Sequence, residues 1–107
     1  MFGLFKRKKP KTLLDGVNSS IVDIYRPYLV NNKNLPDEKI LEIVQTVMRA
    51  FQQASESKQE RLSGTTMMNI GIKFIKVYDL AGPDFFIEHL KYEINLYLTS
   101  GLRKDYL

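Results

Sequence analysis

The chain has 107 residues, of which 44% are hydrophobic and 26% charged, and its formal net charge is +4. This length accommodates one domain, and the balance of apolar and charged residues is typical of a folded chain. The absence of cysteine excludes disulfides and zinc–thiolate sites. No apolar run reaches the roughly 18 residues that a spanning helix needs, and no signal peptide pattern is present, which predicts a cytoplasmic protein.

The positive charge is concentrated at the N-terminus. Residues 1–12 contain five Lys or Arg and no acidic residue, whereas the rest of the chain contains eleven Lys or Arg and twelve Asp or Glu. The predicted body is therefore close to neutral and lacks the excess cation of a broad phosphate-binding surface. Nucleic-acid binding would have to use the N-terminal segment.

Residues 1–11 combine large apolar side chains with a basic cluster. Such a segment favours weak contact with an anionic membrane, since apolar groups enter the headgroup region while cations meet the lipid. The alternatives are a solubilising tail without specific contacts, or a segment that binds nucleic acid or an acidic protein. The candidate contact residues are Phe2, Leu4, Phe5, Lys6, Arg7, Lys8, Lys9 and Lys11.

The first predicted helix covers residues 12–26. Thr12 suits its N-cap, with Asp15 at the capping-box distance. Pro27 lacks a backbone N–H and restricts the residue before it, so the helix should stop or kink there.

The second predicted helix begins at Pro36, where proline suits the first helical position. Its apolar stripe comprises Ile40, Ile43, Val44, Val47, Met48, Phe51 and Ala54. Residues 52–63 are polar and form either a protruding end of this helix or a flexible loop.

A central helix is predicted for residues 64–83, with Gly82-Pro83 ending it. One apolar row comprises Met67, Ile70, Gly71, Phe74, Val77, Tyr78 and Ala81, and a second comprises Met68, Ile72, Ile75 and Leu80. The water-facing positions are Asn69, Lys73, Lys76 and Asp79. Gly71 on the packing side indicates either a close approach of another helix or chance. A fourth helix is expected to run from Asp84, its N-cap, to Ser100.

These elements predict an all-α fold, an antiparallel four-helix bundle of residues 12–101 with a basic tail at 1–11 and a short C-terminal tail at 102–107. The apolar rows exceed what two further helices can cover, which favours a homodimer or a groove for a partner. Ordinary core packing in a monomer is the alternative. The expected contact surface comprises Met68, Ile72, Ile75, Tyr78, Tyr92 and Tyr97.

The sequence offers little chemistry. His89 is the only histidine, and Glu93 lies four residues on, but no third His or Cys completes a metal site. We interpret His89 as an exposed or half-buried residue paired with Glu93. Phosphate-binding, dinucleotide-binding and serine-nucleophile motifs are absent, and residues 63–66 are interpreted as a loop and helix cap. No catalytic residue, metal or cofactor is predicted.

Two segments carry a family resemblance, namely Ile-Leu-Glu-Ile-Val-Gln at 40–45 and Gly-Leu-Arg-Lys-Asp-Tyr at 101–106. With the size and helix order, they make the last two thirds of the chain resemble the pediocin-like bacteriocin immunity proteins. The basic N-terminus and the Gly82-Pro83 junction do not match that family. The resemblance implies a small cytoplasmic four-helix bundle that recognises a membrane receptor complex and blocks a pore-forming peptide.

We therefore predict a non-enzymatic protein that binds a protein partner or itself, in a bacterial-type cell, held loosely at the inner face of the membrane. The alternative is a nucleic-acid accessory protein that binds through residues 1–11.

Overall fold

The computed structural model describes residues 13–107, and their side chains from residue 16 onward. These residues are all-helical, without a strand in the described range. In chain order the elements are α1 (Leu13–Tyr25), the 3₁₀-helix η1 (Arg26–Tyr28), α2 (Asp37–Ser57), α3 (Gly64–Ser100) and the 3₁₀-helix η2 (Lys104–Tyr106). The predicted contact segment 1–11 and the Thr12 cap lie outside the described residues.

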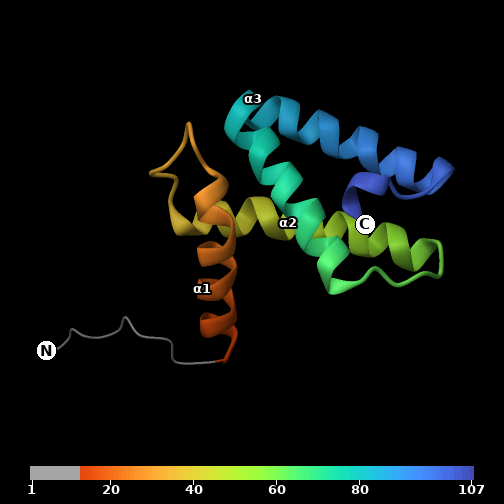
Figure 1. Cartoon of the computed structure of the whole chain (residues 1–107), viewed down its shortest axis with the longest axis horizontal. Coiled ribbons are helices and arrows are strands. Elements are labelled where there is room, and N and C mark those ends of the chain that lie inside the picture. Colours follow the sequence, from red (N-terminus) through yellow and green to blue (C-terminus); the bar gives the residue numbers. More distant parts are fainter. Residues whose placement is uncertain (1–12) are drawn as a thin grey trace, which may run out of the picture.

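Helix α3 is broken at Gly82. Its backbone angles there are φ 89° and ψ 175°, a conformation that glycine adopts readily and other residues avoid. Pro83 has no N–H with which to continue the helical hydrogen bonds. The predicted junction is thus confirmed, and it divides α3 into an N-terminal arm (64–81) and a C-terminal arm (83–100) that folds back from it (Figure 1).

The all-helical class is confirmed, but the antiparallel four-helix bundle is not. Three α-helices are found in the described range, and in Figure 1 α1 runs across α2 rather than alongside it. The chain changes direction after α1 because η1, with Pro27 near its start, leads into an extended residue, Leu29, whose side chain is buried. At the other end of α2, the undecided stretch 52–63 is helical as far as Ser57.

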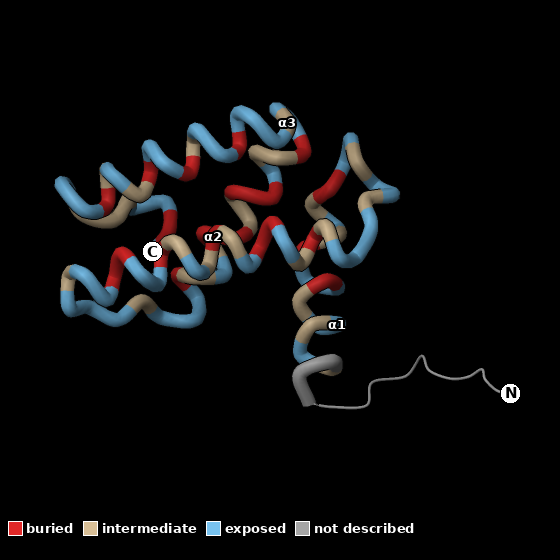
Figure 2. Tube along the Cα trace, turned by 180° about the vertical axis from the view of Figure 1, so that it is seen from behind, coloured by how far each residue is buried: buried red, intermediate tan, exposed pale blue. Residues whose placement is uncertain are grey.

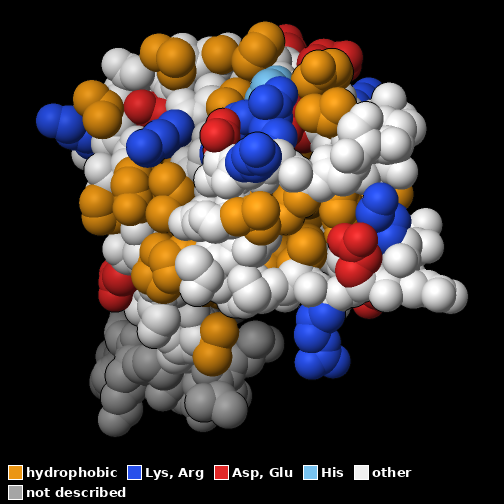
Figure 3. Space-filling view, turned by 45° about the vertical axis from the view of Figure 1, so that its right-hand side comes forward, with side chains coloured by type: hydrophobic (Ala, Val, Ile, Leu, Met, Phe, Trp, Pro, Cys, Tyr) orange, Lys and Arg blue, Asp and Glu red, His pale blue; other side chains and the backbone are white. Residues whose placement is uncertain are grey.

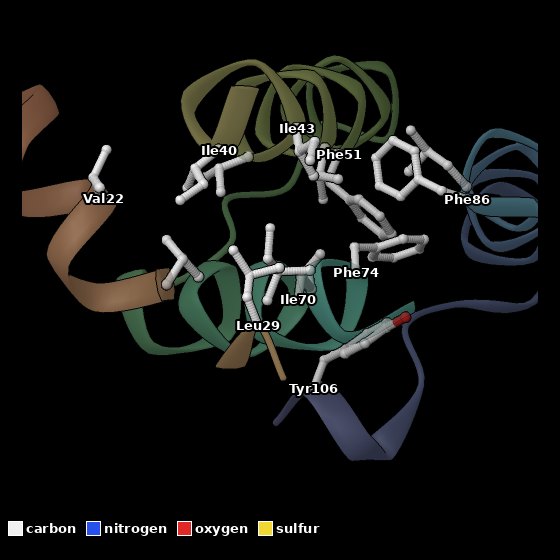
Figure 4. Packing of buried hydrophobic residues seen from close by; sticks show 14 of the residues in the cluster. Val22, Leu29, Ile40, Ile43, Phe51, Ile70, Phe74, Phe86 and Tyr106 are labelled. Atoms are coloured by element: carbon white, nitrogen blue, oxygen red, sulfur yellow. The ribbon is translucent and has the colours of Figure 1, made fainter. Parts of the chain in front are cut away.

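The core lies between α2 and the two arms of α3. Buried residues concentrate on the facing sides of these elements (Figure 2). Ile40, Ile43 and Phe51 of α2 face Ile70 and Phe74 of α3 (Figure 4). The predicted stripe of α2 is confirmed by its burial, because all its members except the partly buried Met48 belong to the core.

Gly71 lies where another side chain would not fit. A Cβ atom there would stand 2.5 Å from Oη of Tyr25 and 2.7 Å from Cε of Met48. The close approach that the glycine indicated therefore exists, but it is made by side chains of α1 and α2 and not by a helix backbone.

Replacing Gly71 by alanine should not stabilise the fold, although alanine favours the helix. Overpacking against the rigid Tyr25 ring costs about 1–3 kcal/mol, which exceeds or cancels the gain in helix propensity of about 1 kcal/mol. Gly16→Ala is the matched control, because among the described residues a Cβ there meets nothing within 4 Å. Urea unfolding should show Gly16→Ala as stabilising and Gly71→Ala as neutral to destabilising, and equal stabilisation by both would contradict this packing.

Candidate functional site

An open groove runs along the outer face of the N-terminal arm of α3. It has a volume of about 440 Å³ and is lined by Asn69, Ile72, Lys73, Lys76, Val77, Leu80 and Asp105. The residues from α3 recur at helical spacing and so share one face of the helix, whereas Asp105 comes from η2. This surface, defined by those seven residues, is named the outer groove.

Two tyrosines hold the cations of the outer groove in place. Nζ of Lys76 lies 5.3 Å from the ring centroid of Tyr28 in η1. On the other side, Nζ of Lys73 lies 5.5 Å from the ring centroid of Tyr106 in η2. The arm therefore runs between the two 3₁₀-helices (Figure 1), and both ammonium groups are positioned by cation–π contacts.

The charge of the outer groove is unbalanced. Within residues 16–107, ion pairs involve other side chains, and neither Lys73 nor Lys76 takes part in one. Asp105 is the single acidic residue of the lining. Figure 3 shows how Lys and Arg side chains lie among hydrophobic side chains on one face of the molecule. A body that is nearly neutral overall thus carries a local excess of cation.

The same groove exposes apolar surface. Leu80 has 82% of its surface exposed, the highest value among the large hydrophobic residues of the described range. Ile72 and Val77 beside it are half-buried. Covering apolar surface of this kind is favourable by about 25 cal/mol per Å². An apolar surface next to ordered charges is typical of a site that recognises another molecule.

The predicted contact residues do not form one exposed surface. Met68 and Tyr92 are exposed, whereas Ile72 and Tyr78 are half-buried, and of the six predicted residues only Ile72 lines the outer groove. The placement of Ile75 and Tyr97 on an outer surface is wrong, since they are 0% and 2% exposed.

The burial of Ile75 and Tyr97 follows from the fold of α3 and of the C-terminal residues. Because the chain folds back at Gly82, the C-terminal arm and η2 cover sides of the central helix that the sequence left open. Tyr97 stacks on Phe51 at 6.0 Å between ring centroids and donates a hydrogen bond to Glu60 over 2.6 Å. Burial and the Glu60 carboxylate raise the pKa of Tyr97 to about 12.

Asp79 is buried, although its helical position predicted exposure to water. Its carboxylate accepts hydrogen bonds from the backbone N–H groups of Val30, Asn31 and Asn32 over 2.8–3.1 Å. Burial alone would raise its pKa, but these bonds outweigh burial and hold the pKa of Asp79 below its ordinary value. Asp79 therefore fastens the loop after η1 to α3, beside the outer groove.

Asp79→Asn should cost about 2 kcal/mol at neutral pH, because an amide cannot replace the charged acceptor. Since the folded pKa is depressed, this stabilisation is complete above the unfolded pKa of about 3.9 and is lost as pH falls through the folded value. Urea unfolding at pH 7 and pH 3 should show a smaller difference between wild type and variant at pH 3. A difference that does not change with pH would contradict the role of the charge.

A second polar cluster surrounds Glu93, whose carboxylate is buried. Nε of Arg103 donates to its two oxygens over 2.7 and 2.8 Å, Oη of Tyr106 donates over 2.9 Å, and Nε2 of His89 lies 3.9 Å away. Burial would raise the pKa of Glu93, but Arg103 and Tyr106 outweigh it and lower the pKa. Burial, followed by Lys73, lowers the pKa of His89. His89 is half-buried beside Glu93, as predicted, but its lowered pKa means that the contact is not an ion pair at neutral pH.

The Glu93 cluster fastens the C-terminal residues to α3. Arg103 and Tyr106 belong to the segment that leads into and forms η2, so their bonds hold it against the C-terminal arm of α3. Among the described residues, no group of three or more His, Asp or Glu side chains is arranged to hold a metal ion.

No sequence motif points directly to the outer groove. Helical periodicity predicts that Lys73 and Lys76 face water and that Leu80 belongs to an apolar row, and Asp105 falls in the predicted C-terminal tail. The sequence pattern that could have indicated the outer groove is a helical face on which charged and apolar residues mix. Two lysines three residues apart share that face with apolar residues at 72, 77 and 80.

Comparisons with protein-family models, curated proteins and solved structures find no match to this chain. Among the described residues, no helix is sufficiently long and apolar to cross a bilayer.

Proposed function

We propose that this chain binds a partner protein, without catalysing a reaction, through the outer groove of α3. The observation that carries the proposal is the exposure of Leu80 next to Lys73 and Lys76, two cations held by tyrosine rings and without an ion-pair partner among the described residues. Among the described residues, none covers Leu80 or pairs with these lysines. A partner that covers Leu80 and supplies anions would gain from apolar burial and from charge complementarity.

The finer form of the proposal is an immunity-like protein of a bacterial cell that recognises a receptor complex at the cytoplasmic face of the membrane. In that form, α1, α2 and the two arms of α3 serve as the four helices of a bundle. Support for counting the arms separately comes from the non-helical backbone of Gly82. Membrane contact would fall to residues 1–11, outside the described range.

The proposal is tested by photo-crosslinking in cells that make the protein. A photoreactive amino acid replaces Leu80 in one variant and Gln45, an exposed residue of α2, in the other. We expect position 80 to capture one defined protein much more strongly than position 45 does. Equal capture at both positions, or none at position 80, would show that the outer groove is not the binding surface.

A further inference from the structure

The outer groove restricts the chemistry of what it binds, because its charges lie in a row along one helix. Lys73 and Lys76 are three residues apart, which corresponds to an axial distance of about 4.5 Å, and Leu80 lies about 6 Å further along. Asn69, one turn before Lys73, donates to the backbone carbonyl of Tyr106 over 3.2 Å, which fixes η2 beside the row. Two cations are thus followed by an apolar position.

A second copy of the chain fits this surface poorly. A symmetric dimer brings the same patch of both subunits together, so the lysine pairs of both copies would meet around one axis. Like charges facing each other across an interface are unfavourable. The single Asp105 of each lining cannot neutralise both pairs.

Single-stranded nucleic acid fits poorly as well. Stacking of bases needs free aromatic faces, but the tyrosine rings beside the groove, Tyr28 and Tyr106, each already have a lysine over one face. Tyr106 is also buried. Besides Asn69 and Asp105, the remaining lining consists of the aliphatic side chains of Ile72, Val77 and Leu80, which match apolar side chains better than phosphates.

We infer that the outer groove receives an acidic amphipathic helix of the partner protein, an inference that rests on the proposed function. The matching helix carries two carboxylates one turn apart, opposite Lys73 and Lys76, and a large apolar residue in the next turn, opposite Leu80. Recognition of an amphipathic helix through residues three, four and seven apart is an established mode of peptide binding.

Because tyrosine rings hold Lys73 and Lys76, binding an acidic helix there should be more favourable than binding it at two free surface lysines. Exposed ion pairs contribute little, since both long side chains lose rotamer freedom when they pair. Lys73 and Lys76 are already held over rings, so less freedom remains to be lost on binding. Cations fixed in position also set the register of the partner helix.

The test uses two designed helical peptides that share one apolar row and differ only in their charged residues, Glu in one and Lys in the other. Fluorescence anisotropy measures their binding to three proteins: wild type, Lys73→Glu/Lys76→Glu, and the matched control Lys33→Glu/Lys91→Glu. Lys33 and Lys91 are exposed and lie outside the outer groove, so the control has the same net charge as the groove variant. Circular dichroism checks that each variant is folded.

We expect the Glu peptide to bind wild type and the control, and to bind the groove variant about tenfold more weakly, the effect of losing roughly 1.4 kcal/mol. The Lys peptide should prefer the groove variant. Absence of Glu-peptide binding, or equal weakening in both variants, overturns the inference. Binding of a single-stranded oligonucleotide or of anionic vesicles that needs the groove lysines, or a dimer that the groove variant disrupts, overturns it as well. If these tests fail but position 80 still captures a partner, the proposed function stands and only the partner's chemistry is wrong.

Discussion

Phe51→Ala should lower the free energy of unfolding by about 4 kcal/mol, because it removes a fully buried aromatic side chain that the surroundings cannot replace. The ring of Phe51 is 0% exposed. Its centroid lies 6.0 Å from each of the rings of Phe74, Tyr97 and Tyr106. One side chain therefore joins α2 to both arms of α3 and to η2, and its loss affects every one of these contacts.

Urea unfolding followed by circular dichroism measures this effect, with Phe85→Ala as the control. Phe85 is exposed and stacks only on His89 among the aromatic rings described. Its loss should cost less than about 1 kcal/mol, as for most surface substitutions. Similar costs for the two variants would mean that Phe51 is not the centre of the core.

The second large effect is expected for Glu93→Ala, at about 1–3 kcal/mol, which is typical of leaving a buried hydrogen-bonding group without its partner. The substitution removes the acceptor of Arg103 and leaves the buried Tyr106 hydroxyl without its bond. Because these residues hold η2, the variant should also loosen the C-terminal segment. Greater proteolysis after residue 101 and a lower urea midpoint are the measurements.

Arg103→Gln separates the charge from the packing around Glu93. In wild type the pKa of Glu93 is lowered, so its stabilisation is present above the ordinary carboxyl pKa and is lost as pH falls through the folded value. Without Arg103, the pKa of Glu93 should be lowered less than in wild type, which destabilises the fold at neutral pH and less so in acid. The deficit of Arg103→Gln should therefore shrink between pH 7 and pH 3, and a constant deficit would contradict the proposed pairing.

The local features of the sequence predicted the helices well. The periodicity of the second helix placed Ile40, Ile43 and Phe51 on one buried side. Pro27 and the Gly82-Pro83 pair marked real breaks, since restricted or left-handed backbone is encoded by the residues themselves. Ser63 forms the predicted cap by accepting a hydrogen bond from the backbone N–H of Thr66.

Features that depend on distant residues were not predictable in this way. Tyr106 falls in the predicted C-terminal tail, and its burial follows from contacts with Glu93 and Phe51, which lie outside that tail. Helical periodicity predicts that Asp79 faces water. Its burial follows from hydrogen bonds with three N–H groups in the loop after η1. Tertiary hydrogen bonds decided both positions, and helical periodicity carries no information about them.

The outer groove was missed for a related reason. Apolar rows on the central helix can be counted from the sequence. Which sides of that helix η1 and η2 flank cannot be read from it. Once the tyrosines of those 3₁₀-helices are placed, Lys73 and Lys76 lie in fixed positions next to Leu80. Net charge counted along the chain cannot show such a local cluster.

The most direct test of partner binding at the outer groove is lysine acylation, compared between the purified protein and the protein in the cells that make it. Mass spectrometry should show that Lys73 and Lys76 react less in cells, while the exposed Lys33 and Lys91 react equally in both states. Equal reactivity of all four lysines in the two states would contradict binding at the outer groove.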